Sequence, residues 1–415
     1  MIEPIAKSFR KILMSRIPIQ NFIRYCCDEN KTYKNSSTHQ ENFFHIPLNT
    51  DSGYTATMKF REYHLSSVLK SFDSHKMPLD AFLSHYFRTH KALGSKDRLF
   101  ISETVYRYIR WQNLYDHLGK DPASELPHQD PTVAPHLRYA VPAFLYELLT
   151  EVYGETKAQE ICQISNTRAP LTLRVNPLKT TREALLEKWA SSFKAFPCPL
   201  APLGIYFHEK INFFTLPEFN DGLFEIQDES SQLASLLVKP KPQQHVLDYC
   251  AGSGGKTLAF AHQLGNTGQI YLHDIRATAL QKARKRLSRA GIQNVQFQLP
   301  QRKMDWVVVD VPCTGTGTLR RNPDLKWKFE SLSLTRLVQE QKEIFQQALA
   351  YLHPQGTIVY MTCSVLPQEN EQQAADFQTT HNLEIVDQFQ TLPVLDGRDG
   401  FYAVAFKFQN KKQKI

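Results

Sequence analysis

The chain has 415 residues, enough for about two or three domains, and 42% of them are apolar, which excludes a chain too polar to fold. No apolar run approaches the roughly 18 residues of a membrane helix, so a membrane protein is not expected. The net charge of +8 favours a polyanionic partner.

The seven cysteines are an odd number and are widely scattered. None forms a C-x-x-C pair, so the spacing indicates neither a zinc site nor a disulfide framework, and we expect no bound metal. The N-terminus lacks the apolar core of a secretory signal, so we expect reduced thiols and a cytoplasmic protein. The cysteines are Cys26, Cys27, Cys162, Cys198, Cys250, Cys313 and Cys363.

The N-terminal part of the chain changes character near residue 59. Residues 1–58 mix polar residues with scattered aromatics and are expected to form an irregular extension of unknown role. Residues 59–160 are predicted to form a helical domain, because apolar residues recur at helical spacing from Leu79 to Phe87. We expect Gly94 to close that helix and Ser95 to cap the next one.

A small α+β module is predicted over residues 161–235. Pro170–Val175 has the pattern of a strand, and Thr181 is positioned to cap a helix that runs through Trp189. Two further strand-like pieces, Gly204–His208 and Phe213–Thr215, follow.

From residue 236 to residue 410, strand and helix patterns alternate, and a basic tail, 411–415, ends the chain. This alternation predicts a mostly parallel, doubly wound sheet with helices on both faces. The expected strands are His245–Cys250, Gln269–Asp274, Asn294–Leu299, Trp306–Asp310, Thr357–Met361, Leu383–Val386 and Ala403–Phe408. The expected helices are Lys256–Leu264, Ala277–Ala290, Leu334–Leu352 and one from about Pro367.

A glycine-rich turn, from Asp248 to Thr257, follows the first of these strands. Its glycines let the backbone approach a ligand and present N–H groups at a helix N-terminus. A phosphate-binding P-loop needs glycine where Cys250 stands, and the spacing is not G-x-G-x-x-G either. A nucleotide hydrolase therefore remains only an alternative. Asp248 suits a ligand that carries an amine, such as the methionine part of S-adenosylmethionine.

Asp274 ends the second strand and could accept the two ribose hydroxyls of a nucleoside, or it could simply cap the helix that follows. Together with the glycine turn it favours a nucleoside ligand.

Two cysteines stand at the ends of two later strands. Cys313 follows Asp310 and Pro312, and Cys363 lies between Thr362 and Ser364. One such cysteine alone would more often be buried filler, but two in one crevice indicate chemistry. A thiol is mostly protonated near neutral pH, so the nucleophile needs cationic or dipolar help.

Basic residues surround the first cysteine loop. Arg320, Arg321 and Lys326 follow it, and the run from Arg276 to Lys303 holds eight Lys/Arg and no Asp/Glu. Such a run can be a solvated helix face, but its place beside the thiols favours a nucleic-acid track. Alkylation of a pyrimidine at C5 uses all these parts, because a thiolate that adds at C6 makes C5 nucleophilic.

These motifs resemble the Sun-type RNA (cytosine-5)-methyltransferases, a family that includes bacterial enzymes for ribosomal small-subunit RNA. Asp248–Thr257 resembles D-x-C-A-A-P-G-G-K-T, with Gly252 and Ser253 as departures, and Asp310–Arg321 resembles D-x-P-C-S-G-x-G-x-x-R-R, with Thr314 for serine. Further segments similar to the family are Leu79–Arg110 (its NusB-like helical domain), Arg168–Asn176 and Gln227–Gln232 (which precede its catalytic domain), Asn322–Trp327, Thr362–Ser364 and Asp399–Phe401.

The resemblance implies a Rossmann-like catalytic domain, an RNA-binding NusB-like domain at 59–160, an RRM-like module at 161–235, and S-adenosylmethionine as methyl donor. It makes Cys363 the nucleophile and Cys313 the thiol that aids product release, and it places Asp310 and Lys256 at the active site. The implied cofactor residues are Asp248, Cys250, Ala251, Gly252, Ser253, Gly254, Gly255, Lys256, Asp274 and Asp310.

The implied substrate is a cytosine of ribosomal RNA, with Arg320, Arg321 and Lys326 as RNA contacts and a monomer as the active form. A tRNA or other RNA cytosine is an alternative, as is an inactive RNA-binding protein of the same fold. One departure concerns adenine recognition. The family usually carries an aspartate after the third strand, and Gln298–Lys303 has none.

Overall fold

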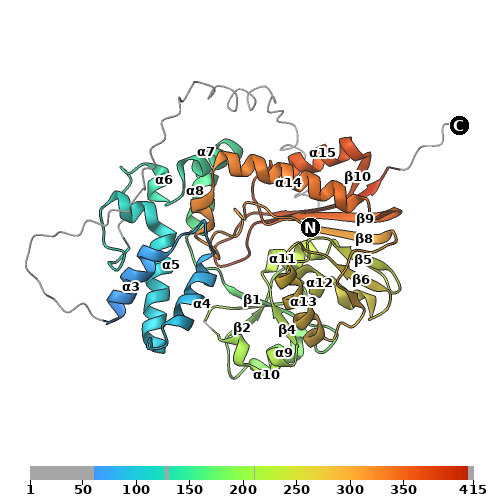
Figure 1. Cartoon of the computed structure of the whole chain (residues 1–415), viewed down its shortest axis with the longest axis horizontal. Helices are drawn as coiled ribbons and strands as arrows, with labels where there is room; N and C mark the ends of the chain where they lie inside the picture. The colour runs from blue at the N-terminus through green and yellow to red at the C-terminus, as the bar shows by residue number, and fades with distance from the viewer. Residues whose placement is uncertain (1–59, 127–129, 210, 410–415) are drawn as a thin grey trace, which may run out of the picture. The chain divides into compact units, whose positions relative to one another are not determined.

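A computed structural model describes residues 60–126, 130–209 and 211–409 (Figure 1). The predicted extension, 1–58, and the basic tail, 411–415, lie outside these residues. Within them, no helix combines the length and apolar character of a membrane span. The described residues begin with six helices: α3 (Phe60–Ser71), α4 (Leu79–Thr89), α5 (Ser95–His117), α6 (Pro135–Arg138), α7 (Ala143–Tyr153) and α8 (Glu155–Ser165).

The predicted apolar stripe of α4 is confirmed, since Leu79, Leu83 and Tyr86 are buried against α3 and α5. The helix ends differ from the prediction. α4 ends at Thr89, because the backbone of His90 turns out of the helix at φ −110° and ψ 69°. Ser95 begins α5 instead of capping it.

The next region forms a four-stranded antiparallel sheet in the order β2-β3-β1-β4. Thr181 caps its helix as predicted, accepting from Ala184 N at 3.2 Å. The strand predicted at Phe213–Thr215 is a 3-10 turn, because the apolar Phe213 is buried between Phe207 and Phe224 without pairing to a strand. The elements are β1 (Leu171–Val175), α9 (Arg182–Trp189), β2 (Ala195–Pro197), β3 (Gly204–Phe207), α10 (Pro217–Asn220) and β4 (Phe224–Ile226).

The C-terminal region is built on a seven-stranded sheet in the order β10-β11-β9-β8-β5-β6-β7. Its strands are β5 (His245–Asp248), β6 (Gln269–Leu272), β7 (Val295–Gln296), β8 (Met304–Asp310), β9 (Leu352–Thr362), β10 (Leu383–Thr391) and β11 (Phe401–Phe408). Its helices are α11 (Glu229–Ser235), α12 (Gly255–Phe260) with a 3-10 turn over Ala261–Leu264, α13 (Ala277–Ala290), the 3-10 turn η3 (Leu325–Lys328), α14 (Ser331–Leu349) and α15 (Glu371–His381).

The predicted doubly wound sheet is confirmed. Strands β7, β6, β5, β8 and β9 are parallel, and β11 is antiparallel to both β9 and β10. One apolar core lies under α11, α12 and α13 and the other under α14 and α15, which Figure 1 shows on opposite faces. The chain leaves β5 toward β6 and returns on the other side at β8, so the carboxyl ends of β5 and β8 form the switch point where such sheets bind ligands.

Several predicted boundaries in this region are wrong, and the strand expected at Leu383–Val386 runs on to Thr391 as β10. The strand expected at Asn294–Leu299 has only the two residues of β7. β9 runs through Gly356 without a break, because glycine lets its backbone approach the carbonyls of Met304 and Asp305 at a register irregularity. α15 begins at Glu371, because the preceding residues form a turn onto the Pro367 carbonyl.

Candidate active site

The two strand-end thiols meet in space. β8 and β9 are parallel neighbours, with Asp310 paired to Met361, so their loops leave the same edge of the sheet. Cys313 Sγ lies 3.3 Å from Cys363 Sγ, and the Cys363 N–H donates to Cys313 Sγ at 3.3 Å. Both side chains are partly buried. The structure therefore confirms the expectation from the sequence that the two thiols lie side by side.

Close backbone packing holds the two thiol loops together. Gly317 N donates to Cys363 O at 2.9 Å, and Gly400 N donates to Gly317 O at 2.9 Å. A Cβ on Gly317 would lie only 2.2 Å from Gly400 O, so only glycine fits between the two segments.

A buried polar network behind Cys313 was missed by the sequence reasoning. Glu369 is fully buried and accepts from Thr314 N at 2.9 Å and from Gln341 Nε2 at 2.9 Å. Gln341 also donates to Pro312 O at 3.0 Å, and Tyr360 donates to Gln341 Oε1 at 3.1 Å. These contacts fix the backbone on both sides of Cys313. The only sign of this network in the sequence was Glu369 itself, an acidic residue six positions after Cys363.

The surroundings of Cys313 favour the protonated thiol. Its hydrogen bond with Cys363, its burial and the charge of Glu369 together raise the pKa of Cys313 well above its ordinary value. Cys313 can therefore hold a proton at neutral pH directly beside its neighbour, which suits a proton donor better than an attacking thiolate.

Asp310, at the end of β8, forms an ion pair with Lys256 across the switch point. Lys256 Nζ lies 2.9 Å from Asp310 Oδ2 and 3.0 Å from Ser231 Oγ, and it stands 4.6 Å from the centre of the Phe401 ring. The lysine is almost fully buried, so the pair is a fixed polar feature of the crevice floor.

The glycine turn connects β5 to α12. Gly252 and Gly254 have φ values of +52° and +80°, which favour glycine, and Ala251 N donates to His273 O at 2.9 Å. Beneath it, Asp248 is fully buried, with Oδ2 accepting from Thr257 at 2.6 Å and Oδ1 without any partner among the described residues. Burial raises the pKa of Asp248 to about 7.

The rest of the turn is packed from behind. Burial raises the pKa of Cys250 well above its ordinary value, so this thiol is unreactive. Ser253 accepts from Arg286 Nη1 at both its carbonyl (2.9 Å) and its hydroxyl (2.8 Å), and Arg286 also pairs with Glu225 of β4 at 3.0 Å. Gly255 has open space where a Cβ would project. The turn thus leaves room for a ligand on its outer side.

Asp274 lies beside the turn, as expected. It accepts from Gly252 N at 2.8 Å and from three nitrogens of Arg276, the backbone N and Nε at 2.9 Å and Nη2 at 3.0 Å. Although burial acts in the opposite direction, hydrogen bonds from Arg276 and Gly252 lower the pKa of Asp274. The carboxylate is therefore ionised at neutral pH and is held at the side of the turn by Arg276.

The three basic residues expected to contact RNA are engaged inside the protein. Arg320 and Lys326 are only 2% and 1% exposed. Arg320 and Arg321 both pair with Asp399, and Arg321 also pairs with Asp228 at 2.8 Å. The prediction of an open basic surface at these positions is therefore wrong, because the two arginines form ion pairs with carboxylates that are distant in the sequence.

Lys326 donates to Arg110 O at 2.6 Å and to Asn166 Oδ1 at 2.7 Å. Burial and the nearby Arg110 lower the pKa of Lys326 well below its ordinary value. It joins η3 to the N-terminal helices instead of facing a partner. In the described part of the chain, no group of three or more His, Cys, Asp or Glu could hold a metal ion.

Comparisons with known proteins agree with this geometry. A family model described as 16S rRNA methyltransferase RsmB/F matches residues 235–407, and one described as an RsmF/B-like ferredoxin-like domain matches residues 141–213. The chain is 34% identical over 288 residues to the ribosomal RNA small subunit methyltransferase B of Proteus mirabilis, covering 66% of this chain and 67% of that protein.

A probable ribosomal RNA small subunit methyltransferase B of Synechocystis is 32% identical over 256 residues, a match that spans 59% of this chain and 57% of that protein. The crystal structure of a methyltransferase homolog protein from Pyrococcus horikoshii superposes with a TM-score of 0.58 at 26% identity, covering 66% of this chain and 98% of that one. The chain thus spans little more than half the length of one curated relative and about two thirds of another.

Proposed function

Because this chain belongs to the RsmB/F family of 16S rRNA methyltransferases, we propose that it methylates C5 of a cytosine in ribosomal RNA with S-adenosylmethionine as the donor. The observation that carries the proposal is the 3.3 Å separation of two thiols at the switch point of the sheet. Nucleophilic attack alone needs one cysteine. When the attack is followed by release of a covalent adduct, a second thiol can assist the release.

In this proposal Cys363 attacks and Cys313 assists release. The Cys363 thiolate forms a bond to C6 of the ring, and the ring electrons move to C5, which becomes nucleophilic. S-adenosylmethionine, when bound, supplies the methyl group at C5. A base then removes the C5 proton, the electron pair restores the ring double bond, and the Cys363–C6 bond breaks. Cys313, which keeps its proton, supports this last step beside the departing sulfur.

The residues at the switch point fit the donor. Asp248 has an orphaned buried oxygen next to the turn, which suits the ammonium group of the methionine part. The glycine turn offers space and backbone N–H groups, and Asp274 suits the ribose. Lys256 and Asp310 form the polar floor between this crevice and the thiols, where they would orient the cytosine edge.

Ribosomal RNA is favoured over tRNA or another RNA because both curated relatives are named for the small ribosomal subunit. The inactive RNA-binding alternative would rest on the missing aspartate in Gln298–Lys303, but the paired thiols and the glycine turn favour an active enzyme.

The decisive experiment is methyl transfer from radiolabelled donor to 16S rRNA, naked and in partly assembled subunits, followed by bisulfite sequencing. We expect one protected cytosine that requires the protein. If label appears only in tRNA, the substrate is a tRNA cytosine and not ribosomal RNA. Absence of label from every RNA, with RNA still bound, would favour the inactive binder.

A further inference from the structure

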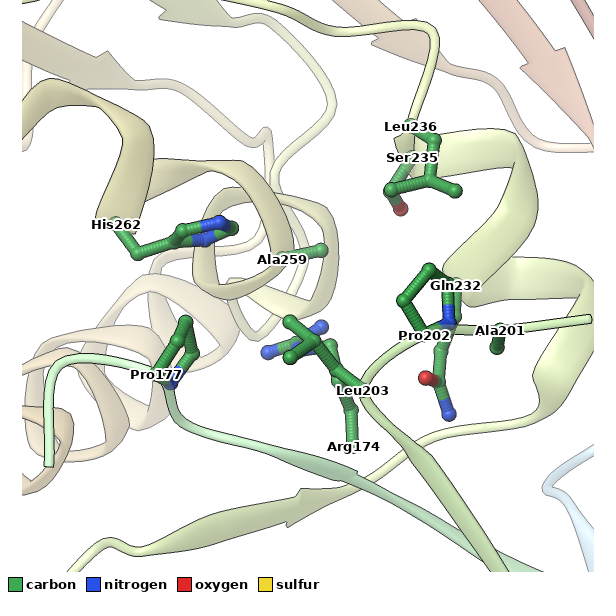
Figure 2. Close-up of a pocket in the computed structure, with 10 residues that line it drawn as sticks. All are labelled: Arg174, Pro177, Ala201, Pro202, Leu203, Gln232, Ser235, Leu236, Ala259 and His262. Carbon is green, nitrogen blue, oxygen red and sulfur yellow. The ribbon is translucent and has the colours of Figure 1, made fainter. Parts of the chain in front are cut away.

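A cavity of about 270 Å³ lies apart from the thiols, between the four-stranded module and α11 and α12 (Figure 2). Arg174 and Leu203 reach it from the module, while His262 follows α12 and Leu236 follows α11. It lies next to the active centre, since Ala259, which lines it, is one helical turn beyond Lys256. It is a separate site, because neither Lys256 nor the two thiols line it.

Two polar atoms among the lining residues are buried and have no partner in the described chain. One is Gln232 Oε1. The amide of Gln232 is held in one orientation, because its Nε2 donates to Leu173 O at 3.1 Å and to Gln227 O at 3.0 Å. The other is His262 Nδ1. An unpaired buried polar atom costs free energy unless a ligand or water satisfies it, so this pair indicates a site for a bound group.

The charges around the cavity narrow the choice of ligand. Arg174 is 5% exposed and supplies a buried cation, whose Nη1 donates to Gln227 Oε1 and whose charge is partly offset by the nearby Glu225. Burial and the charge of Arg174 lower the pKa of His262 more than an interaction with the Ala259 backbone raises it, so its ring is neutral. An ammonium ligand would be repelled by Arg174, and a carboxylate would leave its oxygens against Gln232 Oε1. A neutral ring that carries both a donor and an acceptor satisfies all three groups.

The walls of the cavity are apolar and include Pro177, Leu203 and Leu236. They suit the two faces of a flat ring, and the volume is at the small end for a ligand pocket. We propose that this cavity binds a single nucleobase. Gln232 Oε1 would accept from an exocyclic amine, and Arg174 would donate to a ring nitrogen or carbonyl oxygen.

The base could belong to a free nucleoside or to a nucleotide of an RNA strand. The RNA source rests on the proposed function, whereas binding of a free nucleoside does not. Arg182, whose Nη1 donates to Ala201 O at 3.4 Å on the rim, is a partly exposed cation that could meet a backbone phosphate.

The test uses the full chain with S-adenosylhomocysteine present, so that nucleosides are kept from the donor crevice. Equilibrium dialysis measures adenosine, cytidine, guanosine and uridine. Leu236→Trp fills the cavity from a side chain that is 41% exposed, and Leu332→Trp, at 82% exposed on α14, is the matched control. We expect one nucleoside to bind, at least a tenfold loss with Leu236→Trp, and less than a twofold change with Leu332→Trp.

The RNA arm uses oligonucleotides that carry 4-thiouridine or 6-thioguanosine. A photo-crosslink to residues 201–203 or 232–236, lost in Leu236→Trp, would assign the base to a strand even if no free nucleoside binds. His262→Ala is a second variant, expected to weaken binding at least threefold with an unchanged melting temperature. If no nucleoside binds and no crosslink forms to the residues of the cavity, the proposal is overturned. None of these measurements requires methyl transfer, so they are independent of the proposed activity.

Discussion

At the scale of single residues, the two thiols have different surroundings, although both lie just after a strand of the same sheet. Cys313 Sγ accepts from the Cys363 N–H, and the fully buried Glu369 accepts from the N–H of the next residue, Thr314. Cys363 directly follows the last residue of β9. The surroundings of Cys313 raise its pKa, which favours the protonated role that we propose for it and leaves attack to Cys363.

Replacement of each thiol should therefore give a different failure. Cys363→Ala should abolish methyl transfer and form no adduct, because the bond to C6 cannot form. Cys313→Ala should accumulate a covalent protein–RNA adduct, because attack proceeds and release is slow. Denaturing gels with labelled RNA separate the two outcomes. Cys198→Ala, buried in the module, is the control and should behave as the wild type. Equal behaviour of both active-site variants would contradict the assignment.

Asp248 makes a second prediction, on the pH dependence of stability. Its folded pKa of about 7 lies above the ordinary aspartate pKa of 3.8, so the folded state binds this proton more tightly than the unfolded state. Stability from this group is therefore fully present below about pH 4 and is lost as pH rises to about 7, by up to about 4 kcal/mol.

The measurement is urea unfolding of the wild type and of Asp248→Asn between pH 5 and pH 8. Asparagine can still accept from Thr257, and it removes the titration. The difference in unfolding free energy between variant and wild type should grow in favour of the variant as pH rises. Parallel pH profiles would show that Asp248 does not titrate in this window.

At the scale of elements, the sequence predicted where the site is but not how it is held. Parallel strands end at one sheet edge, so the meeting of Cys313 and Cys363 followed from strand order alone. The network of Glu369 and Gln341 could not be predicted, because their contacts join residues 28 and 55 positions apart. The predicted ends of helices and strands were wrong for a similar reason, because local side-chain hydrogen bonds and tertiary packing determine where an element ends.

The loop after β8 makes a third prediction. Gly317→Ala would place a Cβ 2.2 Å from Gly400 O, so the two segments must separate and Cys313 must shift relative to Cys363. A displacement of about 1 Å can cost roughly a hundredfold in rate, which is the loss we expect in methyl transfer. Gly94→Ala is the control, because its Cβ would meet an ordinary contact at 3.7 Å. An active Gly317→Ala enzyme would show that the loops tolerate separation.

At the scale of the whole molecule, buried cations join the catalytic region to the helices before it. Arg320 and Lys326 were expected on the surface because the chain is basic there, but charge alone does not reveal burial. Their partners, Asp399, Arg110 and Asn166, are distant in the sequence. Trp327 adds a bond from Nε1 to Ile109 O at 2.6 Å. The catalytic loop is thus attached directly to α5.

This attachment makes the last prediction. Lys326→Met keeps the length of the side chain but leaves Arg110 O and Asn166 Oδ1 without their donor, at a cost of roughly 2–4 kcal/mol in unfolding free energy. Chemical denaturation followed by tryptophan fluorescence should show the lower stability and an earlier transition, because Trp111 and Trp327 lie on the two sides of the junction. Lys157→Met, which removes only an exposed pair with Glu160, should change stability by less than about 0.5 kcal/mol. Equal stability of the two variants would mean that the buried lysine does not hold the two regions together.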